Sequence, residues 1–345
     1  MLISPPFGGG RAPVLARNTV ASSQPLATQA GIEALQNGGN AVDAALATAI
    51  TLTVVEPTMN GLGGDGFAIL WDGKKLHGLN ASGRAPAAWT PEYFAGKTAM
   101  DLIGWNTVTV PGMVAGWIEL SRKFGKLPFA QLFKRAIAYA ENGFPVSPVI
   151  ARQWREAIPI LKNQPGFSAS FLIDGKAPQA GQIWKYPAQA KTLKEIAATE
   201  GDSFYKGPLA QSMVDFAQAT GGCFTMQDFA DNHPDWVEPL AFDYGEYTLH
   251  EIPPNGSGIV AQMALGIVQA ANIKQYPANS AQRIHLQIEA MRIAFADAYA
   301  YVSDARSMTV PTSSLLDRDY LASRAALIDH NKAGSYGPGD PHSGG

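Results

Sequence analysis

The side chains that most often form metal sites or catalytic dyads are scattered along this sequence. Its six histidines are His77, His233, His250, His285, His330 and His342. None lies three or four residues from another histidine or from a cysteine, the short spacings at which zinc ligands commonly occur, so the sequence predicts no metal site. His285 precedes Glu289 by four residues. Such pairs are common on helices, and we expect a structural hydrogen bond between the two rather than a catalytic dyad.

The sequence also shows no recognisable nucleophile. Cys223 is the single cysteine, so it forms no intrachain disulfide, and a reducing compartment fits. A reactive thiol needs a lowered pKa and a neighbouring base. The flanking Gly222 and Phe224 offer neither, and we expect a buried or loop thiol. The short sequence Gly256-Ser257-Gly258 follows prolines and precedes a predicted helix, which differs from the serine elbow of α/β-hydrolases.

A glycine-rich loop is the remaining candidate motif. Gly61, Gly63 and Gly66 satisfy the spacing G-x-G-x-x-G of dinucleotide-binding proteins, which requires a strand before the loop and a helix after it. Here a helix precedes the loop and a strand follows. The loop is therefore predicted to be a backbone turn that packs tightly or faces a ligand, and not a nucleotide site.

Composition limits the classes of function that remain. The chain has 345 residues, of which 46% are hydrophobic and 16% charged, and its net charge is -3. It can bury a large core, and it lacks the basic surface typical of proteins that bind nucleic acid or anionic membranes. A small molecule or another protein is the expected partner. The first residues lack the basic and apolar regions of a signal peptide, and no stretch is long enough to span a membrane, so a cytoplasmic location is expected.

The apolar pattern predicts an α+β fold rich in helices. Asn40 is predicted to cap a buried helix from Ala41 to Val55. A hairpin follows, with strands at Phe67 to Trp71 and Lys74 to Leu79 around an Asp72-Gly73 turn. Further helices are predicted at 111–126, 129–142, 191–198, 210–219, from Ile259 onward and at Ser280 to Tyr301, and a further strand at 246–252. Without internal repeats or low-complexity linkers, residues 1–345 are predicted to form a single domain.

The final residues have the composition of an exposed segment. A predicted helix pair, with apolar positions at 315–321 and 325–329, is followed by a stretch rich in glycine, proline and serine. Residues 337–345 are therefore predicted to be flexible and cleavable. The alternative is an ordinary C-terminus.

Seven motifs, in order along nearly the whole chain, resemble the large subunit of the γ-glutamyltranspeptidase family. They are Gly38-Gly39-Asn40-Ala41-Val42-Asp43-Ala44-Ala45, Val55-Glu56-Pro57, Gly63-Gly64-Asp65-Gly66-Phe67, Val110-Pro111-Gly112-Met113-Val114-Ala115-Gly116, Glu141-Asn142-Gly143-Phe144-Pro145-Val146, Ile252-Pro253-Pro254-Asn255-Gly256-Ser257-Gly258 and Glu289-Ala290-Met291-Arg292.

This resemblance implies an N-terminal-nucleophile hydrolase, an αββα four-layer sandwich completed by a small subunit cut from the same precursor. The precursor would cleave itself before a threonine, and the flexible segment at 337–345 would lie at the processing site. The new threonine would supply the nucleophile and its own base in the small chain, so no catalytic residue is assigned to this chain. No cofactor and no metal are implied. A dimer of heterodimers is left open.

The sequence departs from the family where the substrate is held. Typical γ-glutamyl enzymes carry Arg-Glu-x-Ala-Pro, and that arginine grips the substrate carboxylate with two hydrogen bonds. Aligned on Ala85-Pro86, the positions of the arginine and the glutamate are taken by Ser82 and Gly83, and Arg84 lies two residues later. Arg84, with Ser82, is predicted to bind the carboxylate of a differently shaped amide. The alternative is that Arg84 is structural, capping a carbonyl or pairing with an acid.

This pattern is similar to the cytoplasmic branch of the family that hydrolyses other small amides, as oxamate amidohydrolase does. The predicted function is hydrolysis of the amide of a small carboxylate-bearing substrate. Three alternatives are a γ-glutamyl transferase or glutathione hydrolase, an amidase of the cephalosporin acylase type, and a non-catalytic binding protein with the same fold.

Overall fold

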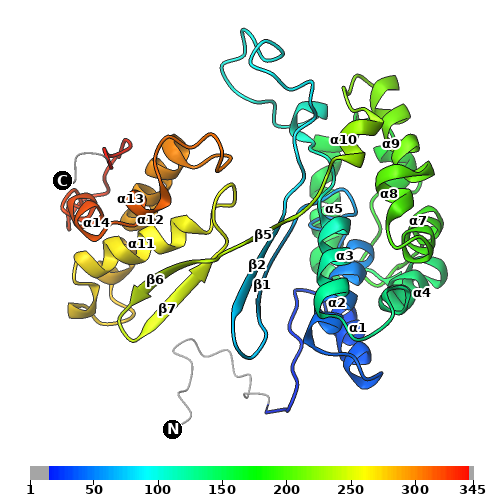
Figure 1. Ribbon diagram of the computed structural model, residues 1–345, viewed down its shortest axis with the longest axis horizontal. Helices are drawn as coiled ribbons and strands as arrows, with labels where there is room; N and C mark the ends of the chain where they lie inside the picture. The colour runs from blue at the N-terminus through cyan, green and yellow to red at the C-terminus, as the bar shows by residue number, and fades with distance from the viewer. Residues whose placement is uncertain (1–14, 342–345) are drawn as a thin grey trace. The chain divides into compact units, whose positions relative to one another are not determined.

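The computed structural model describes residues 15–341, which form two compact units. The first unit contains residues 15–65 and 83–233, and the second contains 66–82 and 234–341. Helices predominate over strands in the structure (Figure 1), which confirms the predicted helix-rich α+β class. That residues 1–345 act as one domain stays a prediction.

The first unit begins with two helices rich in small residues, which pack against each other in antiparallel directions. They are α1 (Pro25–Gln36) and α2 (Ala41–Val55). Their backbones approach closely at Gly31, where an added Cβ would lie 2.9 Å from the carbonyl oxygen of Ala44. Asn40 caps α2 as predicted, and the Asn40 amide in turn donates a hydrogen bond to the Asp43 carboxylate. The buried Asp43 carboxylate also accepts from the amides of Lys126 and Leu127, so one acidic residue fixes both the start of α2 and a distant loop.

The rest of the first unit is mainly helical. Its longer helices are α3 (Met113–Phe124), α4 (Lys134–Asn142), α5 (Pro148–Leu161), α7 (Pro187–Ala198) and α9 (Pro208–Ala219), and its short ones are α6 (Phe167–Phe171), α8 (Asp202–Lys206) and α10 (Met226–Ala230). A two-stranded sheet joins β3 (Phe144–Pro145) to β4 (Ile183–Trp184). The helix predicted at 129–142 is divided, because residues Phe129–Phe133 form a 3-10 turn before α4.

The second unit begins with the predicted hairpin. Strands β1 (Gly66–Trp71) and β2 (Leu76–Ala81) pair antiparallel, with Ile69 opposite Gly78, and β2 also pairs with β5 (Asp235–Val237). The return strand starts two residues later than predicted, because the Asp72 carboxylate accepts from the amides of Lys74 and Lys75 and keeps both in the turn. A second, separate hairpin consists of β6 (Leu240–Tyr244) and β7 (Tyr247–Glu251).

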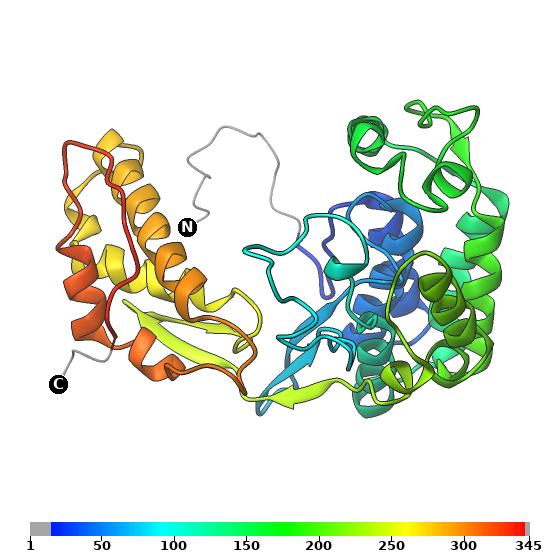
Figure 2. The ribbon, with the colours of Figure 1, turned by 90° about the horizontal axis from the view of Figure 1, so that it is seen from above.

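Four helices complete the second unit: α11 (Ile259–Ala270), α12 (Ala281–Tyr301), α13 (Thr312–Leu315) and α14 (Arg318–Ala325). Figure 2 shows α11 and α12 side by side, and between them lie the buried Met263, Ile267 and Ile293. The buried Gln262 amide donates to carbonyls of both strands of the β6–β7 hairpin. The second unit thus has its own core. No helix within residues 15–341 is long and apolar enough to cross a membrane.

The segment after α14 is held on α12 by two buried carboxylates. Glu289 accepts from the Gly334 amide and the Tyr336 hydroxyl, and Asp297 accepts from the Gly339 amide at 2.8 Å. The flexible segment predicted at 337–345 includes residues 342–345, which lie outside the described residues. Its flexibility stays a prediction.

Candidate functional site

Ser82 belongs to a cluster of three polar side chains in the second unit. Its hydroxyl donates to Asn80 Oδ1 at 2.7 Å and accepts from Asn255 Nδ2 at 3.0 Å, while Asn80 Nδ2 donates to Asn255 Oδ1 at 2.8 Å. Asn80 lies on β2, and Asn255 on the loop between β7 and α11. Ser82 and Asn80 are half-buried and Asn255 is exposed. The cluster offers uncharged donors and acceptors and no guanidinium.

Arg84 lies at the start of the segment 83–233 of the first unit, where it contacts a histidine. Its Nη2 donates to His233 Nε2 at 2.9 Å, and His233 Nδ1 lies 2.9 Å from the carbonyl oxygen of Asp231. Because a guanidinium only donates, Nε2 accepts and the imidazole proton lies on Nδ1, which donates to Asp231. The Arg84 amide in turn donates to Asn232 Oδ1 at 3.4 Å. Arg84 is thus held by the residues 231–233, next to the first unit's last helix.

Gly83, between these two residues, has no space for a side chain. A Cβ built on it would lie 1.4 Å from the carbonyl oxygen of Val110. The neighbouring backbone is tied down as well, because the Val110 amide donates to the carbonyl of Arg84 at 2.9 Å. The position where typical γ-glutamyl enzymes carry glutamate therefore accepts only glycine on this backbone, which agrees with the departure seen in the sequence.

The glycine-rich loop after α2 is partly packed and partly open. The Gly64 carbonyl accepts from the amides of Gly112 and Met113, which fixes the loop at the start of α3. An added Cβ at Gly61 or Gly63 would meet nothing within 4 Å. Both line a cavity of about 990 Å³ whose other wall includes Trp184 and Tyr186. The loop thus packs tightly at Gly64 and borders open space at Gly61 and Gly63. That it faces a ligand stays a prediction.

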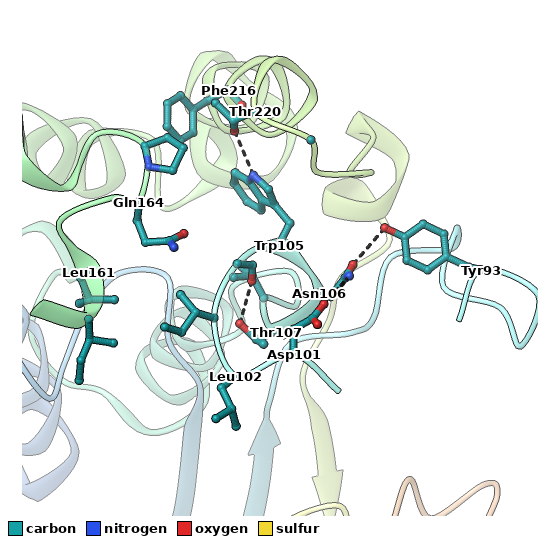
Figure 3. A pocket seen from close by; sticks show the side chains of 16 residues that line it. Tyr93, Asp101, Leu102, Trp105, Asn106, Thr107, Leu161, Gln164, Phe216 and Thr220 are labelled. Carbon is teal, nitrogen blue, oxygen red and sulfur yellow. Dashed lines mark hydrogen bonds between the residues drawn. The ribbon is translucent and has the colours of Figure 1, made fainter. Parts of the chain in front are cut away.

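A second cavity in the first unit, of about 730 Å³, is formed by the loop at 101–108 and the ends of α5 and α9. Figure 3 shows its polar edges: Trp105 Nε1 donates to Thr220 Oγ1 at 3.0 Å, and the Tyr93 hydroxyl donates to Asn106 at 3.0 Å. The Lys97 ammonium, followed by the Asn106 amide, holds the pKa of Asp101 below its ordinary value. The cavity suits an amphipathic group. Neither Ser82 nor Arg84 lines it.

The predicted His285–Glu289 hydrogen bond is wrong. His285 Nε2 contacts the carbonyl of Asp329 at 2.8 Å, and Glu289 instead accepts from Arg292, Gly334 and Tyr336. The segment after α14 supplies partners for both side chains, and their four-residue spacing gave no sign of this. Burial works to raise the pKa of Glu289, but the bonds from Tyr336, Gly334 and Arg292 hold that pKa below its ordinary value.

Sequence reasoning missed three residues that surround the predicted ones. Asn80 and Asn255 hold Ser82, and His233 holds Arg84. Asn80 lies two residues from Ser82, where the alternation of a strand points both side chains to one face. Asn255 lies 173 residues from Ser82, and His233 lies 149 residues from Arg84, so no local pattern joins these two to their partners. The one available signal was that Asn255 falls within a motif shared with the family.

The chain matches known proteins along most of its length. The family described as gamma-glutamyltranspeptidase matches residues 27–342. The chain is 37% identical over 327 residues to the oxamate amidohydrolase proenzyme of Klebsiella pneumoniae, and 35% identical over 317 residues to the glutathione hydrolase-like YwrD proenzyme of Bacillus subtilis. The matches cover 91% of this chain in both cases, but 61% and 60% of those relatives. The chain thus spans about three fifths of the curated relatives it matches.

Solved structures give the same result for the fold. Gamma-glutamyltranspeptidase from Pseudomonas nitroreducens, complexed with L-DON, superposes with a TM-score of 0.85 at 33% identity over 93% of this chain and 97% of that chain. Cephalosporin acylase from Bacillus halodurans superposes with a TM-score of 0.86 at 41% identity over 97% of this chain and 65% of that chain. These likenesses confirm the predicted fold of an N-terminal-nucleophile hydrolase.

Proposed function

Because this chain belongs to the gamma-glutamyltranspeptidase family, we propose that it is the large subunit of a self-cleaving amidohydrolase with an N-terminal threonine nucleophile. The substrate is the amide of a small carboxylate-bearing molecule, of which oxamate is the simplest. The relatives named as an oxamate amidohydrolase and as hydrolase and acylase proenzymes support this class of reaction. The Pseudomonas nitroreducens chain, which the match covers almost fully, supports the separation into two chains.

The observation that carries the substrate proposal is the uncharged cluster at Ser82. A γ-glutamyl α-carboxylate is best held by a guanidinium, which offers two parallel donors. At the aligned position this protein has a hydroxyl already bonded to Asn80 and Asn255. Gly83 beside it leaves no room for the glutamate of the typical motif. Both features favour a substrate other than a γ-glutamyl amide.

The proposed reaction needs only a nucleophile, its base and water. The threonine hydroxyl attacks the amide carbonyl while its own α-amine takes the proton. The carbon–nitrogen bond then breaks, the proton returns to the leaving nitrogen, and ammonia departs from an acyl-enzyme. Water hydrolyses the ester, so oxamate and water give oxalate and ammonia. In this scheme Arg84 binds the substrate carboxylate, and this chain holds no nucleophile.

A second candidate is an amidase of the cephalosporin acylase type. It is favoured by the 41% identity to the solved cephalosporin acylase and by the 35% identity to the acylase ACY 1 proenzyme of Pseudomonas. A third candidate function is glutathione hydrolysis, because relatives at 34% and 35% identity are named glutathione hydrolase proenzymes. Cytoplasmic location and a heterodimer remain parts of the proposal.

Expression of the complete reading frame tests the two-chain part of the proposal. We expect two bands on a denaturing gel, and N-terminal sequencing of the smaller one should begin with threonine. A single uncut chain would contradict self-cleavage. The substrate part is tested with Ser82→Arg in the same protein. We expect γ-glutamyl-p-nitroanilide hydrolysis to rise and oxamate hydrolysis to fall, and the opposite change would contradict the assignment of Ser82.

A further inference from the structure

The side chains of Ser82, Asn80 and Asn255 form a closed ring of three hydrogen bonds. Ser82 Oγ donates to Asn80 Oδ1, Asn80 Nδ2 donates to Asn255 Oδ1, and Asn255 Nδ2 donates to Ser82 Oγ, at 2.7, 2.8 and 3.0 Å. The backbone amide of Ser82 also donates to Asn80 Oδ1 at 3.0 Å, so this oxygen uses both of its lone pairs. Each side chain thus donates once, and the ring closes without a charged group.

The ring leaves two amide hydrogens unused. A carboxamide nitrogen carries two hydrogens, and among residues 15–341 the Nδ2 atoms of Asn80 and Asn255 each donate a single hydrogen bond. Because the two hydrogens lie on different sides of the nitrogen in the amide plane, the second one points away from the ring. Asn80 is half-buried, whereas Asn255 is exposed. The free N–H of Asn255 is therefore the donor that a small molecule can reach.

The loop that carries Asn255 is anchored on both sides of this residue. Ile252 and Pro254 are buried before it, and α11 begins after it at Ile259, which is fully buried. Two successive prolines, Pro253 and Pro254, restrict the backbone here because each ring fixes φ. The Asn255 amide is thus held in place before a ligand arrives, which lowers the entropy cost of binding.

We propose that Asn255 is a substrate-binding residue whose free N–H donates to an oxygen of the substrate carboxylate, an inference that rests on the proposed function. Ser82 stands where typical γ-glutamyl enzymes carry the arginine that grips this group, and Asn255 bonds directly to Ser82. An amide N–H that donates to a carboxylate makes a charge-assisted hydrogen bond, which is stronger than a bond between two neutral groups. Asn255 thus recognises the carboxylate through one directed donor, where a guanidinium would offer two.

Asn255→Asp tests this contact with little change in shape. The new carboxylate accepts from Asn80 Nδ2 as Asn255 Oδ1 does, and it accepts from Ser82 Oγ, which already lies 3.3 Å from Asn255 Oδ1. The ring therefore persists, but a negative charge replaces the free donor beside the substrate carboxylate. Because like charges at this distance repel, we expect KM for oxamate to rise about tenfold or more with a smaller change in kcat. The inhibition constant of the product oxalate should rise with KM.

The matched control is Asn279→Asp, because Asn279 is exposed and lies in the second unit as well. This variant makes the same change of charge, and its KM should equal that of the unmodified protein. Thermal unfolding of both full-length variants should match that of the unmodified protein, since neither substitution removes a buried contact. An unchanged KM for Asn255→Asp, or a fall in kcat without a rise in KM, would overturn the proposal.

Failure of the proposed function gives a different result. The unmodified full-length protein is assayed first, with oxamate and with γ-glutamyl-p-nitroanilide. If only the γ-glutamyl substrate is hydrolysed, the proposed substrate is wrong, and Asn255→Asp is assayed with this substrate, which also carries a carboxylate. If neither substrate is hydrolysed, the proposed function fails, and the role assigned to Asn255 fails with it.

Discussion

Asn in place of Asp297 should strongly destabilise the second unit. The Asp297 carboxylate is fully buried. It accepts from Tyr320 Oη at 2.9 Å, from Arg324 Nε at 3.1 Å and Nη2 at 2.9 Å, and from the Gly339 amide. Arg324 is 6% exposed, so removing the negative charge leaves a buried cation without its counter-ion. Breaking such a pair costs about 3–5 kcal/mol.

The assay is urea unfolding of the full-length protein, followed by hydrogen exchange of peptides from α12 and α14, which reports the second unit separately. With a slope of about 2 kcal/mol/M, Asp297→Asn should lower the midpoint by about 1.5–2.5 M. Glu238→Gln, at an exposed ion pair with Lys75, is the control and should leave the midpoint unchanged. The double variant Asp297→Leu with Arg324→Met should recover the part of the loss that comes from the unpaired cation, while the Tyr320 hydroxyl and the Gly339 amide still lose their acceptor. A loss below about 1 kcal/mol, the scale of a surface pair, would refute the reasoning.

Three further outcomes are expected. Gly83→Ala should destabilise the first unit by about 1–3 kcal/mol in thermal unfolding, because the new Cβ collides with the Val110 carbonyl. Gly61→Ala, whose Cβ would point into open space, should leave the stability unchanged, and equal effects of the two substitutions would contradict the packing described at Gly83. The pKa of Glu289 is lowered in the folded state, so the stabilisation by its carboxylate is present above the ordinary carboxyl pKa and is lost as the pH falls below it. Hydrogen exchange at Gly334 should speed up in that acidic range, and Glu289→Gln should remove this dependence on pH. Arg84→Ala should raise KM for a carboxylate-bearing amide at least tenfold with a smaller change in kcat, and an unchanged KM would assign Arg84 a structural role.

Local patterns predicted the elements that position the site. The alternation of apolar and polar residues around Asp72-Gly73 predicted the β1–β2 hairpin. The helical spacing of apolar residues predicted the bounds of α12 almost to the residue. The pattern did not show which strand residues the turn would retain, because that depends on the Asp72 carboxylate accepting from two backbone amides. Periodicity likewise could not say which apolar face of α12 lies in the core of this chain.

Long-range contacts account for what the sequence did not predict. The second unit joins residues 66–82 to residues 234 onward. Asn255, one partner of Ser82, and His233, the partner of Arg84, come from segments about 150 residues or more away. His285 and Glu289 were paired by spacing alone, yet each finds a better partner in the segment after α14. The need for glycine at position 83 comes from the Val110 backbone, which only the folded structure places beside it.

The ratio of kcat/KM for oxamate, measured by ammonia release, to that for γ-glutamyl-p-nitroanilide tests the central claim most directly. Both substrates are assayed with the same processed, full-length preparation. A ratio well above one is predicted, since the uncharged Ser82 cluster replaces the guanidinium that grips a γ-glutamyl carboxylate. Activity on the γ-glutamyl substrate alone would contradict the account.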